Sequence, residues 1–353
     1  MKKMRAFAGL TLTLALLLCT GCSGGAQSIN QSGGNSGADD NSGTVSVTYR
    51  FAGTMPESHH MSKAMAMVAD EMSQKTDGKI KFDMYYSNSL YKDAEMVEVV
   101  PDGAVEIVQT NLGQWTGVVP EISVFNMHTI FRDNEHFLAV QADQEMFDMI
   151  DKALQEKANC KLLAWIDFGQ NTILSKKPIS TMEDLKGKVI RCDSEYAQYF
   201  ISALGGAPQS MSVADVYSAL EKGVVDGAIA GFSSFIDRSW YEVGSYVVDE
   251  FFTKTLDAFV CNLDWWNGLS ADEQSMLQNA CQSAYEWTCQ ASVEAETSAK
   301  EALAEKGVEL IRLTPEERAR WEEAVTPAES AKLVSQLGQE EADQLLAIVE
   351  RNR

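Results

Sequence analysis

The sequence predicts an α/β protein of two lobes that share one long helix. With 353 residues, the chain is longer than a single hydrophobic core usually organises. Strand and helix patterns alternate in two successive stretches, which we assign to lobe I at 45–168 and lobe II at 169–255. A later stretch, 269–306, has no glycine or proline and predicts one long helix. Two α/β units followed by such a helix indicate this architecture.

Lobe I is predicted from its periodicity. Apolar residues alternate at period two from Val45 to Phe51, and Met61 and Met65 then begin a helical repeat that ends at Gly78. By the same criteria the remaining strands are predicted at 80–86, 105–109 and 161–167, and the remaining helices at 96–100 and 134–157. The order β-α-β-α-β predicts a parallel or mixed sheet with helices on both faces.

Lobe II repeats this alternation. Its strands are predicted at 172–175, 188–190 and 224–230, a capped turn at 180–185, and helices at 194–204 and 212–222. Since strands and helices alternate again, a second α/β unit is predicted.

The stretch 256–310 is predicted to hold a crossover strand and the long helix shared by both lobes. Ser270 is the expected N-cap, Glu273 completes a capping box, and Gly307 ends the helix. At 1.5 Å per residue the helix would be about 55 Å long, which is enough to bridge both lobes. C-terminal helices are predicted at 311–353.

The charge balance excludes some classes of partner. The chain has 29 Lys and Arg against 51 Asp and Glu, a formal net charge of −22. Binding to nucleic acid or to an anionic membrane through a basic face needs clustered cations, so neither is predicted. An anionic ligand would have to be held by a local cation.

Residues 1–22 predict a lipoprotein signal peptide with a lipobox. A basic start precedes an apolar segment that is too short to span a bilayer. The stretch "LLLCTGC" resembles a bacterial lipobox, which implies that Cys22 is lipidated and becomes the mature N-terminus. The pattern departs at Cys19, where an aliphatic residue is usual. An ordinary signal peptide cut near Gly21 or Ala26 is the alternative.

Residues 23–44 predict a flexible linker between the lipid and the folded part. They are rich in glycine, serine and asparagine and almost free of apolar residues, so they cannot bury enough surface to order themselves. The expected location is therefore extracytoplasmic, lipid-anchored to the cell membrane, in a periplasm or on the outer face of the cytoplasmic membrane.

The cysteines predict neither a metal site nor a disulfide framework. Five follow the signal peptide: Cys160, Cys192, Cys261, Cys281 and Cys289. Because this number is odd, at least one thiol is free or paired outside the chain. They form no CxxC pair and no Cys/His zinc spacing, so most are expected in the core, with one disulfide left open.

Four stretches, taken in order, resemble one family. They are "TYRFAGTMPESHHMSKAMAMVADEMSQKTDGKIKFDMYY", "PEISVFNMHTIFRDNEH", "SKKPISTMEDLKGKVIR" and "VADVYSALEKGVVDG". From residue 45 to about 310 the chain resembles the extracytoplasmic solute-binding proteins of TRAP (tripartite ATP-independent periplasmic) transporters, the DctP-type family. The resemblance implies a two-lobed, periplasmic-binding-protein-like fold whose lobes are joined by crossing strands, near 165–171 and 256–262, and by the long helix.

The resemblance also implies the function. Such a protein closes its lobes on a small organic acid and delivers it to an ion-coupled membrane permease, without enzymatic activity and without a cofactor. Because capture chemistry is the same in both cases, a ligand-binding module that feeds a sensor or receptor is the alternative.

Arg191 is the best candidate for ligand binding. It matches the arginine of the family's "KIR" motif, and the resemblance implies that it pairs with the ligand's carboxylate. A guanidinium is always charged, and its planar fork matches a carboxylate bidentately. At the carboxyl end of a strand it would face the crevice where open α/β sheets bind ligands. A surface arginine paired with Asp193 or Glu195 is the alternative.

Other cleft positions of the family carry over only in part. Many members have a second arginine where this chain has Asn171, or Gln170, and an asparagine where it has Ala230. The resemblance therefore implies that sialic acid and C4-dicarboxylates are less favoured, and that apolar contacts supply much of the affinity. The remaining candidates, each of which has a purely structural alternative as a cap or a packing residue, are Thr54, Met55, Asn111, Ser194, Tyr217 and Phe232.

Copper binding and catalysis are two other functions with which the sequence can be compared. His59 and His60 lie in a methionine-rich stretch with Met55, Met61, Met65 and Met67, a set of ligands that copper accepts. Met61 and Met65, however, belong to the apolar stripe of the first helix, which favours a core role. The four histidines, at 59, 60, 128 and 136, form no recognisable triad, and GxSxG, Walker A and Rossmann glycine motifs are missing, so no enzyme is predicted.

Overall fold

The computed structural model describes residues 46–353. The predicted signal peptide at 1–22, the lipidation at Cys22 and the linker at 23–44 lie outside the described residues. Within residues 46–353, no helix is both long enough and apolar enough to cross a membrane.

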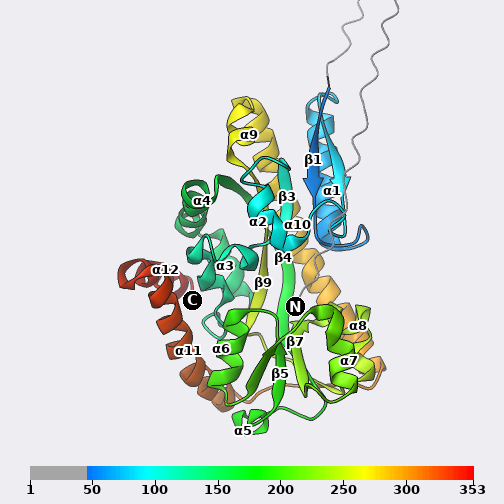
Figure 1. Cartoon of the computed structure of the whole chain (residues 1–353), viewed down its shortest axis with the longest axis vertical. Coiled ribbons are helices and arrows are strands. Elements are labelled where there is room, and N and C mark those ends of the chain that lie inside the picture. Colours follow the sequence, from blue (N-terminus) through cyan, green and yellow to red (C-terminus); the bar gives the residue numbers. More distant parts are fainter. Residues whose placement is uncertain (1–45) are drawn as a thin grey trace, which may run out of the picture. The chain divides into compact units, whose positions relative to one another are not determined.

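One mixed sheet of ten strands organises the described chain (Figure 1). Its main path runs β2-β1-β3-β9-β4-β7-β5-β6, and β8 pairs with both β4 and β10. The strands are β1 (Val47–Ala52), β2 (Ile80–Tyr85), β3 (Ile107–Asn111), β4 (Cys160–Ser175), β5 (Val189–Cys192), β6 (Ala207–Ser210), β7 (Gly227–Gly231), β8 (Tyr246–Val248), β9 (Thr253–Asn262) and β10 (Glu309–Ile311). Strands β1 to β3 and β5 to β7 pair in parallel, whereas β4 and β9 pair antiparallel with their neighbours, as a mixed sheet requires.

The helices cover the sheet. They are α1 (His60–Lys75), α2 (Met96–Val99), α3 (Asn134–Ala142), α4 (Gln144–Ala158), α5 (Met182–Leu185), α6 (Glu195–Ala203), α7 (Val216–Glu221), α8 (Phe232–Asp237), α9 (Leu263–Gly268), α10 (Ala271–Glu305), α11 (Pro315–Leu337) and α12 (Gln339–Arg351). The alternation of strands and helices confirms the predicted α/β class.

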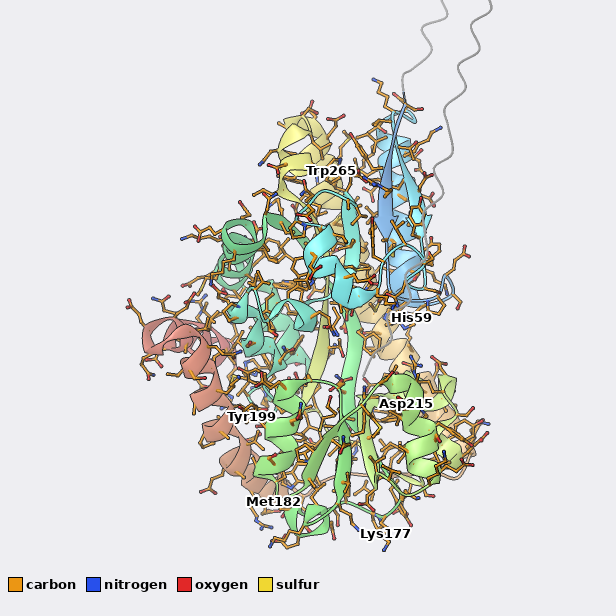
Figure 2. All side chains as sticks on the ribbon, viewed as in Figure 1. His59, Lys177, Met182, Tyr199, Asp215 and Trp265 are labelled. Atoms are coloured by element: carbon orange, nitrogen blue, oxygen red, sulfur yellow. The ribbon has the colours of Figure 1, made fainter. Side chains whose placement is uncertain are left out.

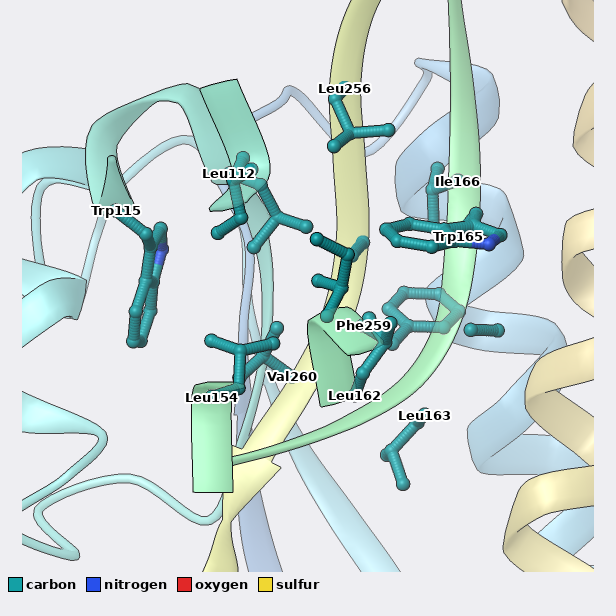
Figure 3. Packing of buried hydrophobic residues seen from close by; sticks show 14 of the residues in the cluster. Leu112, Trp115, Leu154, Leu162, Leu163, Trp165, Ile166, Leu256, Phe259 and Val260 are labelled. Carbon is teal, nitrogen blue, oxygen red and sulfur yellow. The ribbon is translucent and has the colours of Figure 1, made fainter. Parts of the chain in front are cut away.

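Buried apolar clusters define the two lobes. The cluster of lobe I packs β1, β3 and the first half of β4 against α1 and α4, and it includes Phe51. Leu154, Trp165 and Phe259, three of its other members, are labelled in Figure 3. Lobe II has one cluster on each face of its sheet. One includes Ile173, Phe200 and Trp321, and the other includes Leu174, Phe232 and Trp240. The residue boundaries assigned to the lobes from the sequence stay predictions.

Strands β4 and β9 cross from one lobe to the other. They pair from Cys160↔Asn262 to Asn171↔Thr253, and β3 borders β9 while β7 borders β4. The sequence predicted two strands, 161–167 and 172–175, where the structure has the single strand β4. The reason is a β-bulge at Gly169, whose φ of 114° shifts the register without ending the pairing.

The predicted long helix is present as α10. Ser270 is its N-cap and forms the expected capping box with Glu273. Its 35 residues give a length of about 52 Å. Leu277 near its start packs in the core of lobe I, and Leu303 near its end packs in the core of lobe II. The helix is therefore shared by both lobes.

The predicted helix at 134–157 is two helices, α3 and α4. Asp143 separates them because its backbone is extended and its carboxylate caps α4, accepting hydrogen bonds from the backbone N–H groups of Glu145 and Met146. At the C-terminus, α11 places Trp321 in the core of lobe II, and α12 places Leu345 in the core of lobe I. The last two helices thus form another link between the lobes.

Candidate functional site

A cavity of about 380 Å³ lies between the lobes. Its lining is mostly polar: Asn111, Gly113, Gln114, Thr116, Asn126, His128, Asn171, Arg191, Asp193, Ser194, Glu195, Tyr196, Thr253, Lys254 and Thr255. Lobe I contributes the end of β3 and the 3₁₀ turns after it, lobe II contributes β5 and the start of α6, and the crossing strands form the wall between them.

This cavity lies on the face of the crossing strands that points away from α10. Asn171 and Thr255 share that face, because the Asn171 Nδ2 donates to Thr255 Oγ1 at 2.9 Å and both residues line the cavity. Gln170 lies on the opposite face, where it borders a small pocket with Ser292 of α10. Side chains alternate along a strand, so Lys254, the register partner of Gln170, directs its side chain toward α10 as well.

Arg191 is a buried cation without a carboxylate partner. It is 6% exposed, and its Nη1 and Nε donate to the backbone oxygens of Ile229 and Met211, at 2.9 and 3.3 Å. Within residues 46–353 no carboxylate forms an ion pair with it; Glu195 is paired with Lys332 instead. Burial lowers the pKa of Arg191. Of its five N–H donors, three have no partner here, and an anion in the cavity would supply one.

Three other predicted residues line the same cavity. Asn111 caps the 3₁₀ turn Leu112–Trp115, and its Oδ1 accepts from Gly113 N at 2.7 Å. Ser194 is the N-cap of α6. The side-chain amide of Asn171 donates one hydrogen bond to Thr255 Oγ1. Each keeps hydrogen-bonding capacity that faces the cavity. The structure thus brings Asn111, Asn171, Arg191 and Ser194 together.

Several lining residues were not identified from the sequence. Gln114 follows β3 within an irregular turn, and Asn126 ends the 3₁₀ segment Pro120–Asn126. Neither stretch has helix or strand periodicity, so periodicity gave no signal for them. Asn126 and His128 do lie inside one of the four family-like stretches, which marked the segment without indicating which side chains face the cavity.

His128 ties the cavity wall to the C-terminal helix α11. Its Nδ1 lies 3.0 Å from a carboxyl oxygen of Glu329, its backbone N–H donates to the other oxygen at 2.6 Å, and its ring stacks on Phe200. Both side chains are buried, so burial lowers the pKa of His128 to about 3 and raises that of Glu329 well above its usual value. The pair therefore has a structural role: it holds α11 against the cavity wall.

Four predicted residues lie outside the cavity. Thr54 donates to Gln109 Oε1 at 3.0 Å, and the Tyr217 hydroxyl bonds Glu242 at 2.8 Å. Phe232 is 2% exposed and packs in lobe II beneath Lys300. Met55 borders a different crevice, which lies against α10. Since Phe232 is in the core and the lining is polar, the expectation that apolar contacts supply much of the affinity is not met by this cavity.

A second, larger crevice of about 810 Å³ lies against α10, and we call it the α10-side crevice. It is bordered by Met55 and the start of α1, by Phe168 of β4, by α8 and by the middle of α10. His59, labelled in Figure 2, stacks on His60 and Phe168 at its edge. Burial, and then the neighbouring His60, lower the pKa of His59 to about 4.

The methionines weighed as copper ligands divide between core and surface. Met61 and Met65 are fully buried in the core of lobe I, whereas Met67 is 37% exposed. Within the described residues, no group of three or more His, Cys, Asp or Glu side chains is suited to hold a metal ion. The five cysteines beyond the signal peptide are all free, and all but Cys289 are buried.

Comparisons with known proteins agree with this architecture. A model of the family described as "Bacterial extracellular solute-binding protein, family 7" matches residues 51–333. A C4-dicarboxylate-binding periplasmic protein, DctP, of Rhodobacter capsulatus is 30% identical over 262 residues, which cover 73% of this chain and 78% of that protein.

Solved structures share the fold. A TRAP periplasmic solute-binding protein from Ochrobactrum anthropi superposes with a TM-score of 0.82 at 23% identity, covering 87% of this chain and 95% of that one. A TRAP periplasmic solute-binding protein from Roseobacter denitrificans, with bound β-D-glucuronate, gives a TM-score of 0.78 at 25% identity, covering 86% and 99%. The predicted two-lobed fold with a long shared helix is therefore confirmed.

Proposed function

Because the chain belongs to family 7 of the bacterial extracellular solute-binding proteins, the TRAP solute-binding proteins, we propose that it captures one small organic acid between its lobes and delivers it to an ion-coupled TRAP permease. Members of this family bind and transport; they are not enzymes. The observation that carries the proposal is Arg191, a buried guanidinium that lines an interlobe cavity and forms no ion pair within residues 46–353. A ligand carboxylate would complete it.

The lining favours a hydroxylated monocarboxylate over a dicarboxylate. Arg191 is the one lining cation whose charge has no carboxylate partner within residues 46–353, since Lys254 is paired with Asp167. Four amide side chains face the same space, those of Asn111, Gln114, Asn126 and Asn171. Amides donate and accept hydrogen bonds, so they suit hydroxyl groups better than a second carboxylate. The relative from Roseobacter with bound β-D-glucuronate is consistent with this chemistry.

Capture needs no bond to be made or broken. The crossing strands and α10 connect the lobes, so the ligand would bridge Arg191 on lobe II and Asn111 on lobe I and stabilise a closed arrangement. Closure would also remove water from around the ion pair between Arg191 and the ligand carboxylate, and the attraction between the two charges would become stronger.

We extend the proposal to the N-terminus. Lipidation at Cys22 would hold the protein at the cell membrane beside the permease, and residues 23–44 would serve as its tether. An extracytoplasmic location agrees with the periplasmic relative from Rhodobacter capsulatus.

The ligand is tested by a thermal-shift screen of purified protein against sugar acids, C4-dicarboxylates and other small acids. A ligand that binds only the folded chain raises the melting temperature, by several degrees at a hundred times its dissociation constant. D-Glucuronate is the first acid to test, and D-glucuronamide, which lacks the charge, is its matched control. If no carboxylate shifts the transition, or if the amide shifts it equally, the proposed capture of an organic acid is wrong.

The anchor is tested by cell fractionation. The native chain should sediment with membranes, whereas Cys22→Ala should appear in the soluble extracytoplasmic fraction or as an uncleaved precursor. Cys19→Ala is the matched control, because it changes a neighbouring cysteine that is not the lipid acceptor, and it should still sediment. Equal distribution of the native chain and Cys22→Ala would refute the lipid anchor.

A further inference from the structure

The crossing strand β4 has one residue at which all polar groups are held by different parts of the chain. The backbone N–H of Asp167 donates to Thr288 Oγ1 of α10 at 3.2 Å, and its carbonyl accepts from His60 Nε2 of α1 at 2.9 Å. One carboxylate oxygen accepts from Gly169 N at 2.9 Å, and the other binds Lys254 Nζ of β9 at 2.5 Å. Asp167 therefore connects α1, α10, β9 and its own strand.

Asp167 and Lys254 lie where the strands pass from one hydrophobic core to the next. Ile166 packs in the core of lobe I, whereas Ile173 and Leu174 pack in the two clusters of lobe II. Phe252, directly before β9, packs in lobe II, and Leu256 of β9 packs in lobe I. The ion pair thus spans the segment that belongs to neither core.

The same segment holds the second of the two register shifts between the crossing strands, a β-bulge. The register moves from Asp167↔Leu256 to Gln170↔Lys254, so β4 has one residue more than β9 between these pairs. Gly169 supplies the positive φ of 114° that the bulge needs, and Asp167 fixes it by accepting the Gly169 N–H. A bulge re-aims the side chains that follow it, and the next of these on the cavity face is Asn171.

The ion pair is far less accessible than the other ion pairs of the described chain in which a lysine participates. The side chains of Lys254 and Asp167 are 4% and 1% exposed. The Lys254 ammonium is bound to Asp167, so the pair does not compete with a ligand for Arg191, while Lys254 and its strand neighbours Thr253 and Thr255 all border the cavity. This geometry suits a fixed point about which the lobes turn and from which the cavity side chains are aimed.

We infer that the Asp167–Lys254 ion pair is a positioning element of the binding site. It holds the bulge of β4 in the conformation that directs Asn171 and Thr255 into the cavity, and it serves as the pivot for lobe closure. The part of the inference that concerns ligand binding rests on the proposed function. The part that concerns the conformation of β4 without ligand does not.

The test removes the pair in one step. The double variant Asp167→Asn and Lys254→Met avoids an unpaired buried charge, which a single substitution would leave and which could prevent folding. Asp151→Asn with Lys161→Met is the matched control: this Lys–Asp pair also fixes β4, with side chains 16% and 13% exposed, but lies entirely within lobe I. Lys254→Arg, which keeps the charge, is the conservative variant.

Hydrogen exchange and small-angle scattering are measured first without ligand. In the double variant we expect at least tenfold faster exchange of backbone amides in 167–171 and 253–256, and a changed radius of gyration. The control variant and Lys254→Arg should match the native chain in these segments. Equal exchange and an unchanged radius in the double variant would overturn the inference, whether or not any acid binds.

D-Glucuronate is then added, with D-glucuronamide as the uncharged comparison. If the native chain contracts on binding glucuronate, the double variant should contract less and bind it at least tenfold more weakly, yet keep the native preference for acid over amide. Arg191→Ala should lose that preference and keep native exchange in β4. A double variant that contracts and binds like the native chain overturns the inference. A native chain that binds no acid instead refutes the proposed function, and the exchange result then decides the inference.

Discussion

Arg191 and Lys254 are two buried cations on the two faces of the crossing strands, and they differ in their partners. Arg191, on the cavity side, donates hydrogen bonds to carbonyl oxygens and forms no ion pair within residues 46–353; burial lowers its pKa, although the charge of the nearby Asp193 opposes this effect. Lys254, on the α10 side, is neutralised by Asp167. Burying a charge without a counter-ion costs several kcal/mol, so the chain gives up stability at Arg191 that it keeps at Lys254. We therefore interpret Arg191 as a candidate ligand-binding cation and Lys254 as a structural one.

The strongest test of this comparison is Arg191→Ala. Truncating one member of a buried charge pair costs about 2–5 kcal/mol, so the affinity for a carboxylate ligand should fall by at least about 30-fold. Arg191→Lys should recover only part of the loss, because an ammonium lacks the planar fork. Isothermal titration with the acid and its amide measures both effects. If the acid and the amide lose the same affinity, Arg191 supports the fold and does not recognise the charge of the ligand.

A smaller effect is expected from adding a second unpaired cation to the cavity face. Asn171→Arg introduces one beside Thr255, at a position where the resemblance implied an arginine in many relatives. With two cations in the cavity, a ligand with two carboxylates is favoured over a ligand with one. We therefore expect the affinity ratio of a C4-dicarboxylate to a monocarboxylate to rise about tenfold, or ~1.4 kcal/mol. Asn171→Gln, which lengthens the side chain without charge, is the control. A ratio that stays the same in both variants would contradict the charge argument.

The smallest effect concerns the α10 side, where burial keeps His59 neutral. Its pKa is lowered from 6.5 to about 4, so the unfolded chain takes up a proton first as the pH falls below 6.5. Stability due to this group is therefore complete above pH 6.5 and is lost toward pH 4. His59→Asn keeps an acceptor for Met61 N but does not titrate.

As the pH falls from about 6.5 to 5.5, the free energy of unfolding should decrease in the native chain. In His59→Asn this decrease should be smaller, by at most about 1 kcal/mol. Urea titrations at several pH values measure it. His136→Asn is not a suitable control because that ring bonds a backbone oxygen of α12. Ser234→Ala is suitable, because Ser234 borders the same crevice and has no ionisable side chain. A slope equal to that of the native chain would contradict the assignment of a neutral, buried His59.

Local signals explain which parts of the fold were predictable. The ends of α10 follow from a capping box at Ser270 and a glycine at 307, which act within one turn of the helix. The sequence did not predict that β4 is one continuous strand, because Gly169 resembles a strand end unless the pairing with β9 is known. The break at Asp143 was missed although an aspartate at a helix start is a cap signal, since the apolar periodicity continues across it.

The candidate site shows the same division. Arg191 and Asn171 were predicted because they occupy strand positions that correspond to a family pattern, and Asn111 because it follows a strand; all three line the cavity, and their roles stay predictions. Gln114, Asn126 and Tyr196 reach the cavity only through irregular turns and through the packing of α6. Phe232 was predicted at the cleft from its neighbourhood in the sequence, but in the structure it packs with Phe235 and Trp240 in the core of lobe II.

The α10-side crevice has a spectroscopic consequence. Trp115, Trp165, Trp240 and Trp321 are at most 2% exposed, and Trp265 and Trp266 pack against the core of lobe I, whereas Trp287 lines the crevice and is 36% exposed. Its indole is therefore the one among the seven whose surroundings depend most on how α1, α8 and α10 approach one another. A movement of the lobes should change the emission wavelength of the unlabelled protein through Trp287, and Trp287→Phe should abolish that change.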